Sequence, residues 1–189
     1  MSAQVLILKS SPRNLGNSAT LAEQVAAGVR AAGGQAESIF LSGLDIRPCD
    51  GCDFCKENDG CIVLDDMQKL YPKLLAADAI LLASPIYWFT FNAQLKLCID
   101  RWYALWVADH NAFKGKRFGV VLTYADPDMY ISGGVNALHT IESMCRFIEA
   151  EITGYVCGTL AHIGDAQQHT ELLQAAFELG RKLASSAEV

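Results

Sequence analysis

Residues 4–32 contain three consecutive segments that decide the fold: QVLILK (4–9), SSPRNLGNS (10–18) and ATLAEQVAAGVRAA (19–32). The first segment is a short apolar run, typical of a strand buried on both faces of a parallel sheet. The third carries apolar residues at helical spacing: Leu21, Val25, Ala26 and Val29. Asn17 or Ser18 can cap this helix, and Gly33-Gly34 ends it. Strand, polar loop and helix in this order begin a βαβ unit.

The same alternation continues along the chain. Further strands are expected at residues 36–41, 79–83, 117–124 and 152–160, and further helices at residues 65–77, 92–107, 135–150 and 165–185. Tyr71-Pro72 should kink or shorten the first of these helices. Five strands alternating with five helices predict an α/β fold with a doubly wound five-stranded parallel sheet. We expect one domain over residues 1–189, with a cysteine-rich loop inserted at 48–64.

The length, amino-acid composition and net charge of the chain argue against several classes of function. The chain has 189 residues, of which 51% are hydrophobic and 19% charged, so it is long enough for one substantial core. A net charge of −6 without a basic run argues against nucleic acid or a membrane surface as partner. No signal peptide or membrane-spanning segment is expected. A cytoplasmic location follows, where seven cysteines stay thiols or metal ligands.

Ligands of such sheets bind beyond the carboxyl ends of the strands, so the loops after the first, third and fourth expected strands are considered together. Residues 10–18 combine hydroxyls, Arg13, Gly16 and a helix N-terminus, which suits a phosphate. They match neither the P-loop nor the dinucleotide fingerprint. The alternative for this loop is a plain strand-to-helix turn with a serine cap.

The second loop, residues 84–92, contains four aromatic side chains: Tyr87, Trp88, Phe89 and Phe91. Aromatics at a binding edge suit a flat ring system that stacks on them. The alternative is that they pack beneath the loop or form a subunit interface. The third loop carries Thr123, Ser132 and Gly133, where a glycine permits close backbone approach to a ligand or caps the next helix.

Four of the seven cysteines stand close together in residues 48–66, PCDGCDFCKENDGCIVLDD, with spacing C-x2-C-x2-C-x5-C. These are Cys49, Cys52, Cys55 and Cys61. Thiolates this close repel one another, so a metal gathers them, they stay protonated, or they oxidise. Structural zinc usually needs two more widely separated pairs. The other three, Cys98, Cys145 and Cys157, fall in helix or strand patterns and are interpreted as small buried hydrophobes.

A phosphate cradle, an aromatic clamp and a glycine loop on this sheet describe a flavin mononucleotide site. The chain resembles the flavodoxin-like NADPH-dependent FMN reductase superfamily, and within it the iron–sulfur flavoprotein branch. The resemblance is carried by SSPRNLGNS (10–18), PCDGCDFC (48–55) with Cys61, DDM (65–67), ASPIYW (83–88) and AQLK with IDR within 93–101. Beyond residue 105 only the fold pattern and Ser132-Gly133-Gly134 match.

The resemblance implies an oxidoreductase in which reduced NAD(P)H delivers hydride to FMN, which passes electrons to a quinone, nitro, azo or flavin acceptor. The implied phosphate ligands are Ser10, Pro12, Arg13, Gly16, Asn17 and Ser18. The residues implied to flank the flavin ring are Pro85, Ile86, Tyr87, Trp88 and Phe89, with Thr123, Ser132 and Gly133 from the third loop. Arg13 has the alternative of contacting the nicotinamide cofactor's pyrophosphate. No catalytic acid or base is expected, because the cofactor carries the chemistry.

For Cys49, Cys52, Cys55 and Cys61 the resemblance leaves two alternatives. They ligate a 4Fe–4S cluster, or they remain thiols, as in cluster-free relatives. The interleaved carboxylates would lower a cluster's potential unless they face solvent. With a cluster, the chain is an iron–sulfur flavoprotein electron carrier serving a ferredoxin-like partner. A flavin- or thiol-based sensor is the non-enzymatic alternative. An open aromatic site is completed most easily by a neighbouring subunit, so a homodimer or tetramer is expected.

Overall fold

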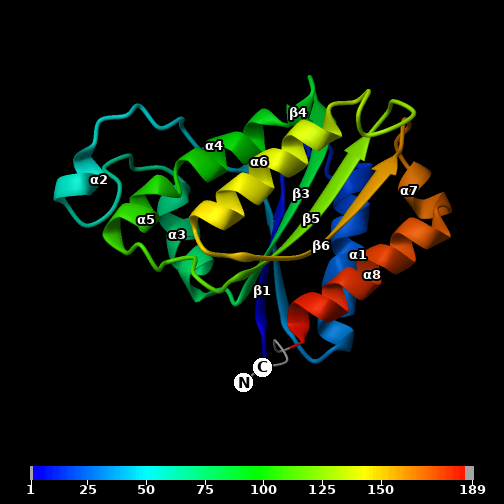
Figure 1. Ribbon diagram of the computed structural model, residues 1–189, viewed down its shortest axis with the longest axis horizontal. Coiled ribbons are helices and arrows are strands. Elements are labelled where there is room, and N and C mark those ends of the chain that lie inside the picture. Colours follow the sequence, from blue (N-terminus) through cyan, green and yellow to red (C-terminus); the bar gives the residue numbers. More distant parts are fainter. Residues whose placement is uncertain (1, 186–189) are drawn as a thin grey trace.

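The computed structural model describes residues 2–185 and has a parallel sheet between two layers of helices (Figure 1). The sheet order is β2-β1-β3-β5-β6, and each neighbouring pair is parallel. Its strands are β1 (Gln4–Lys9), β2 (Gln35–Phe40), β3 (Ala79–Tyr87), β5 (Arg117–Tyr124) and β6 (Glu151–Thr159). A two-residue strand, β4 (Thr90–Phe91), pairs with β3 in the antiparallel direction. The predicted doubly wound five-stranded sheet is confirmed.

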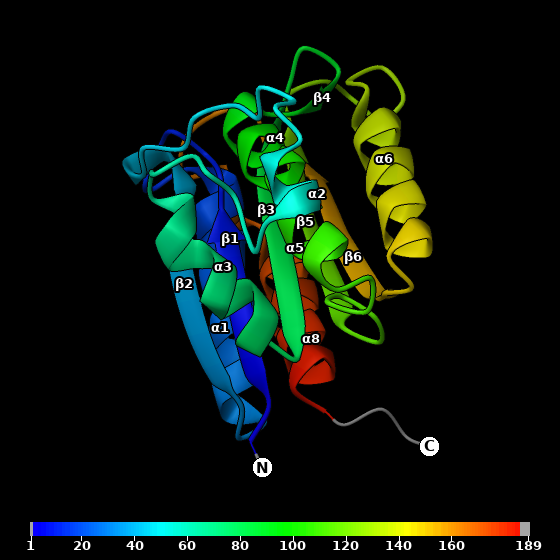
Figure 2. The same ribbon diagram turned by 90° about the vertical axis from the view of Figure 1, so that its left-hand side faces the viewer.

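Helices cover both faces of the sheet (Figure 2). The two long helices of one face are α1 (Asn17–Ala31) and α8 (Thr170–Ala184). The opposite face carries α3 (Met67–Ala76), α4 (Ala93–Asp100), α5 (Tyr103–Ala108) and α6 (Gly134–Phe147). The short helices are η1 (Leu41–Gly43), α2 (Phe54–Glu57) and α7 (Asp165–Gln168). Among residues 2–185, no helix combines the length and apolar character needed to cross a membrane.

Two expected helices are interrupted. The helix expected at 92–107 is two, α4 and α5, because Arg101 and Trp102 form a tight turn with hydrogen bonds to Cys98 and Ile99, three residues back. The last helix is divided into α7 and α8 at His169, where the backbone leaves helical geometry. Pro72 is accommodated within α3, which ends at Ala76. At this break the Arg101 side chain contacts the cysteine segment, residues 47–65.

The contact between α1 and α8 depends on two glycines. A Cβ atom on Gly28 would lie 1.9 Å from the carbonyl oxygen of Phe177, and one on Gly180 would lie 2.0 Å from that of Val25. Both distances are far below van der Waals contact, so the helix backbones touch where no side chain fits. This close crossing fixes α1, and with it the loop that precedes α1.

We predict that Gly28→Ala destabilises the fold. Helix propensity alone would stabilise it by about 1 kcal/mol, whereas the clash with α8 forces the helices apart at a cost of about 1–3 kcal/mol. Urea unfolding of the FMN-free protein measures the sign directly. The control is Arg30→Ala, an exposed position on the same helix. Equal or higher stability of Gly28→Ala would contradict the close crossing.

Candidate functional site

A cavity of about 120 Å³ lies at the carboxyl ends of β1, β3, β5 and β6. Its lining includes eight residues predicted to bind the cofactor: Arg13, Gly16, Asn17, Ser18, Pro85, Ile86, Tyr87 and Thr123. It also includes residues that sequence reasoning missed: Ser11, Tyr124, Ala125, Leu160, Ala161 and Ile163. The last three follow β6, the fifth strand of the sheet. The rule that ligands bind at strand carboxyl ends applies to this loop as well, and could have found it.

The N-terminus of α1 opens into this cavity without a side-chain cap. Gly16 occupies the position before the helix, and no acidic residue stands in its first turn. The prediction that Asn17 or Ser18 caps the helix was wrong. The Asn17 side chain instead donates to the carbonyls of Leu160 (3.2 Å) and His162 (2.8 Å), and accepts from the Ala166 amide. The first-turn N–H groups of α1 therefore remain available to an anion.

Asn92, just before α4, connects the segments that follow β1 and end β3 through buried hydrogen bonds. It is 1% exposed, and its side-chain amide donates to the Ser10 carbonyl at 2.7 Å. Its side-chain oxygen accepts from the Ser84 hydroxyl (3.1 Å) and from the Leu95 amide, which caps α4. Ser42 donates to the carbonyls of both Ser10 and Ser11 at 3.0 Å. The sequence indicated Asn92 only as a helix start, because its partners lie in distant segments.

Six predicted site residues do not line the cavity: Ser10, Pro12, Trp88, Phe89, Ser132 and Gly133. Ser10 is buried, and its hydroxyl donates to the Ala83 carbonyl at 3.0 Å, so it joins β1 to β3 beneath the cavity. Pro12 is exposed at the rim. The other four belong to the adjoining hairpin and its support.

Residues 84–92 form a hairpin rather than the expected irregular loop. β3 runs on to Tyr87, which pairs with Thr90 of β4, so Trp88 and Phe89 are the two turn residues. Their φ angles are 48° and 70°, both in the left-handed region that two-residue hairpin turns usually fill with Asn and Gly. Each such residue costs about 1–3 kcal/mol of strain. Trp88 is 92% exposed, whereas Phe91 is buried in the core.

The β5–α6 connection supports this turn. Gly133 has a φ of 78°, and a Cβ atom there would lie 2.5 Å from the Phe89 Cα. Asn136 donates to the Phe89 carbonyl at 3.1 Å. Ser132 is buried, and its hydroxyl accepts from the Gly134 amide. Gly133 and Asn136 thus contact the turn of the aromatic hairpin, whereas Ser132 bonds within the start of α6.

A second, separate cavity of about 50 Å³ is lined by all four clustered cysteines. Residues of the α4–α5 turn complete it: Asp100, Arg101, Tyr103 and Ala104. It shares no lining residue with the first cavity. Figure 1 shows the cysteine segment with α2 at one extreme of the molecule, beside α5. The four cysteines predicted to point into one small volume thus line one cavity.

The pKa of Cys55 and the pKa values of the three cysteines outside the motif are shifted by different causes. Burial raises the pKa of the Cys55 thiol, and the neighbouring thiols Cys61, Cys49 and Cys52 raise it further. The interleaved acidic residues Asp50, Asp53, Glu57 and Asp59 are all exposed, and Asp50 and Asp53 also line the cavity. Burial alone raises the pKa of the other three, to about 12 for Cys98 and Cys145 and about 11 for Cys157. Those three are structural.

The four-thiol cavity fits a cubane cluster in its donor set. A cubane takes one thiolate at each of four irons, so its ligands surround a volume rather than meet at a point. In the part of the chain that the structure describes, no three His, Cys, Asp or Glu side chains are grouped as ligands of a single metal ion. Glu57 and Asp59 lie outside the cavity lining, whereas the carboxylates of Asp50 and Asp53 would oppose the reduction of a cluster held there.

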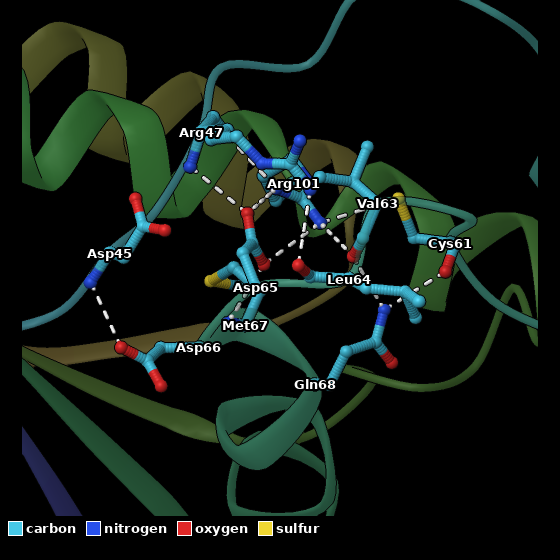
Figure 3. A network of polar contacts seen from close by, with 10 residues as sticks. All are labelled: Asp45, Arg47, Cys61, Val63, Leu64, Asp65, Asp66, Met67, Gln68 and Arg101. Carbon is cyan, nitrogen blue, oxygen red and sulfur yellow. Dashed lines mark hydrogen bonds and ion pairs between the residues drawn. The ribbon is translucent and has the colours of Figure 1, made fainter.

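Figure 3 shows the polar network at the base of the cysteine segment. Arg101 and Asp65 form an ion pair at 2.6 Å, with side-chain exposures of 1% and 0%. Burial alone would raise the pKa of the Asp65 carboxyl, but hydrogen bonds from Arg101 and from the Arg47 and Met67 amides hold it below its ordinary value. Burial raises the pKa of the Tyr71 hydroxyl, whose neighbours are Arg101 and Cys61.

Comparisons with known proteins agree with this geometry. The family model described as NADPH-dependent FMN reductase matches residues 3–152. An iron–sulfur flavoprotein of Methanocaldococcus jannaschii is 30% identical over 186 residues, which is 96% of this chain and 95% of that protein.

Two solved structures are similar along nearly the whole chain. The Trp repressor binding protein of Bacillus subtilis has a TM-score of 0.71 at 27% identity, covering 93% of this chain and 99% of that one. An NAD(P)H:quinone oxidoreductase of Methanothermobacter marburgensis has a TM-score of 0.75 at 18% identity, covering both chains completely. The second likeness bears on the fold alone.

We predict that replacing Trp88-Phe89 by Asn-Gly stabilises the cofactor-free protein by about 1–3 kcal/mol, because these residues adopt left-handed conformations with little strain. Thermal and urea unfolding measure the gain. Trp88→Ala is the control, since alanine keeps the unfavourable φ while removing the exposed ring. A double variant no more stable than Trp88→Ala would show that the turn is not strained.

Proposed function

Because the chain belongs to the NADPH-dependent FMN reductase family, and within it to the iron–sulfur flavoprotein branch, we propose that this oxidoreductase binds FMN in the cavity at the carboxyl ends of the strands. The observation that carries the proposal is the uncapped N-terminus of α1, which opens into that cavity with no acid in its first turn. A phosphate is the ligand that such a terminus favours.

Residues 11–18 hold the phosphate in this proposal. The backbone N–H groups at the start of α1 donate to its oxygens, and Ser18 lines the same wall. Arg13 supplies the positive charge. It lines the cavity, and within residues 2–185 it makes no ion pair that would compete for it. Asn92 and Ser42 contribute indirectly by fixing the backbone of Ser10 and Ser11.

Pro85, Ile86 and Tyr87 line the cavity and would hold the flavin ring. The cavity of about 120 Å³ is too small for the whole cofactor, since sites for molecules of this size usually measure about 300–1,000 Å³. Part of the ring is therefore open to solvent in a single chain. Trp88, 92% exposed on a rigid turn, is placed to cover an open ring or to meet a second subunit.

A homodimer, or a tetramer built from dimers, completes such a site. Exposed apolar side chains around the cavity support it: Leu15, Trp88, Tyr130, Ile131 and Ile163. Apolar surface of this extent is costly to leave in water. Light scattering of the FMN-loaded protein tests the assembly, and a monomeric mass would contradict it.

Bound FMN supplies the redox chemistry, accepting hydride from NAD(P)H and returning electrons to a quinone, nitro, azo or flavin acceptor. The chain's part is to bind and orient. The α1 terminus would hold the phosphate, and the end of β3 would orient the ring.

The four-thiol cavity favours a second candidate, in which the protein is an electron carrier. Cys49, Cys52, Cys55 and Cys61 would hold a 4Fe–4S cluster, which supplies one-electron exchange. A ferredoxin-like protein would then be the redox partner. Free thiols at all seven cysteines fit the reducing cytoplasm as the site of action.

We predict that Arg13→Ala weakens FMN binding about tenfold or more, because it removes a charged hydrogen-bond donor to the phosphate. Binding of riboflavin, which has the same ring but no phosphate, should be unchanged. Fluorescence titration of the two flavins measures both, and Arg30→Ala at the far end of α1 is the matched control. Equal losses for riboflavin and FMN would contradict the assignment of Arg13 to the phosphate.

A further inference from the structure

We propose that Arg101 is the positioning residue of the four-thiol site. Its buried guanidinium holds the cysteine segment (residues 47–65) closed through Asp65 and brings a positive charge to 3.4 Å from the sulfur of Cys61. The inference rests on the cluster-binding half of the proposed function. It concerns a side chain outside the cysteine motif, located at the end of α4.

The guanidinium makes five contacts within the segment. One terminal nitrogen donates to the Arg47 carbonyl (2.9 Å) and to Asp65 Oδ2 (2.6 Å). The other lies 3.4 Å from Cys61 Sγ, 3.4 Å from the Val63 carbonyl and 3.3 Å from Asp65 Oδ1. Such a fork is specific to arginine, since a lysine ammonium cannot span these acceptors in one plane.

These contacts hold the two ends of the cysteine segment together. Arg47 and Asp65 flank the four cysteines in the sequence, and the Arg47 amide also donates to Asp65 Oδ2 at 3.0 Å. Gln68 donates to the carbonyls of Cys61 and Val63, both at 2.9 Å, which fixes the strand of the loop that carries Cys61. The loop from 47 to 65 is thus held from its base, while Cys49 and Cys52 stay exposed.

Asp65 contacts both terminal nitrogens of the guanidinium, and the nitrogen that lies 3.3 Å from Asp65 Oδ1 also lies 3.4 Å from Cys61 Sγ. Among the described residues, Arg101 Nε and the Tyr71 hydroxyl are buried polar atoms without a partner, and Tyr71 neighbours both Cys61 and Arg101. Unpaired buried donors are costly, so the Tyr71 hydroxyl next to Cys61 and Arg101 indicates a place where negative charge is received.

Holding the loop closed would require only the contacts of the guanidinium with carbonyl and carboxylate oxygens. The contact with sulfur adds an electrostatic role, because a cation beside a cluster ligand stabilises the more negative, reduced form. Arg101 therefore has two separable effects: closure of the loop, which needs the fork, and a raised reduction potential, which needs the charge.

The variants Arg101→Lys and Arg101→Gln separate these effects. Lysine keeps the charge and loses the fork, and glutamine loses both. The control is Lys114→Met, which breaks an exposed ion pair with Glu149 away from this cavity. FMN uptake, measured at the cavity that shares no residue with this site, shows that each variant is folded.

In anaerobically reconstituted protein, both Arg101 variants should lose iron to a chelator about 10–100-fold faster than wild type, as is usual when an outer-shell partner is removed. The reduction potential should become more negative in Arg101→Gln but stay near wild type in Arg101→Lys. The control should match wild type in both. Unchanged iron loss in Arg101→Gln would overturn the proposal, and an unchanged potential would overturn its electrostatic half.

A measurement without iron distinguishes failure of this inference from failure of the proposed cluster. In cluster-free protein, hydrogen exchange within residues 47–65 should accelerate at least about tenfold in Arg101→Gln, since one partner of a buried ion pair is lost. Wild-type protein that takes up no iron, with faster exchange in Arg101→Gln, would refute the cluster and keep the closure. Exchange at the wild-type rate would overturn the closure.

Discussion

The arrangement of both candidate sites depends on the short helix α4, which buried polar groups fix at its two ends. At its start Asn92 holds the Ser10 carbonyl and so the loop before α1. At its end Arg101 holds Asp65 and so the cysteine segment. Nine helical steps separate these residues, about 14 Å. Since a buried polar group left without its partner is costly, neither end can be released without disturbing the segment it holds.

Backbone strain is found in the hairpin turn beside the proposed flavin site. Two bulky aromatics occupy turn positions suited to Asn and Gly, and Gly133 leaves no room for a Cβ atom beneath them. A sequence selected for stability alone would not place Trp88 there. Residues adopt unfavourable backbone conformations where a side chain has to be exposed for binding rather than buried in the core. The strained hairpin and the uncapped α1 terminus are therefore the two features that best agree with a ligand site.

The parallel direction of the strands and the doubly wound fold could be predicted from sequence, because apolar runs and helical spacing report which faces are buried. The spacing of the four cysteines also agrees with their lining one cavity. What could not be predicted depends on contacts between distant segments. Asn17 looked like a helix cap but bonds to residues beyond β6. Arg101 and Asp65 are 36 positions apart, and only the fold reveals that they pair.

The most direct test is the visible spectrum of anaerobically purified protein, with FMN and iron assayed on the same sample. The account predicts resolved flavin bands, FMN stoichiometric with the chain, and a broad iron–sulfur shoulder with about four irons per chain. Flavin bands without iron would keep the oxidoreductase and leave the cysteines as thiols. A colourless protein that also fails to take up added FMN would contradict the account at its centre.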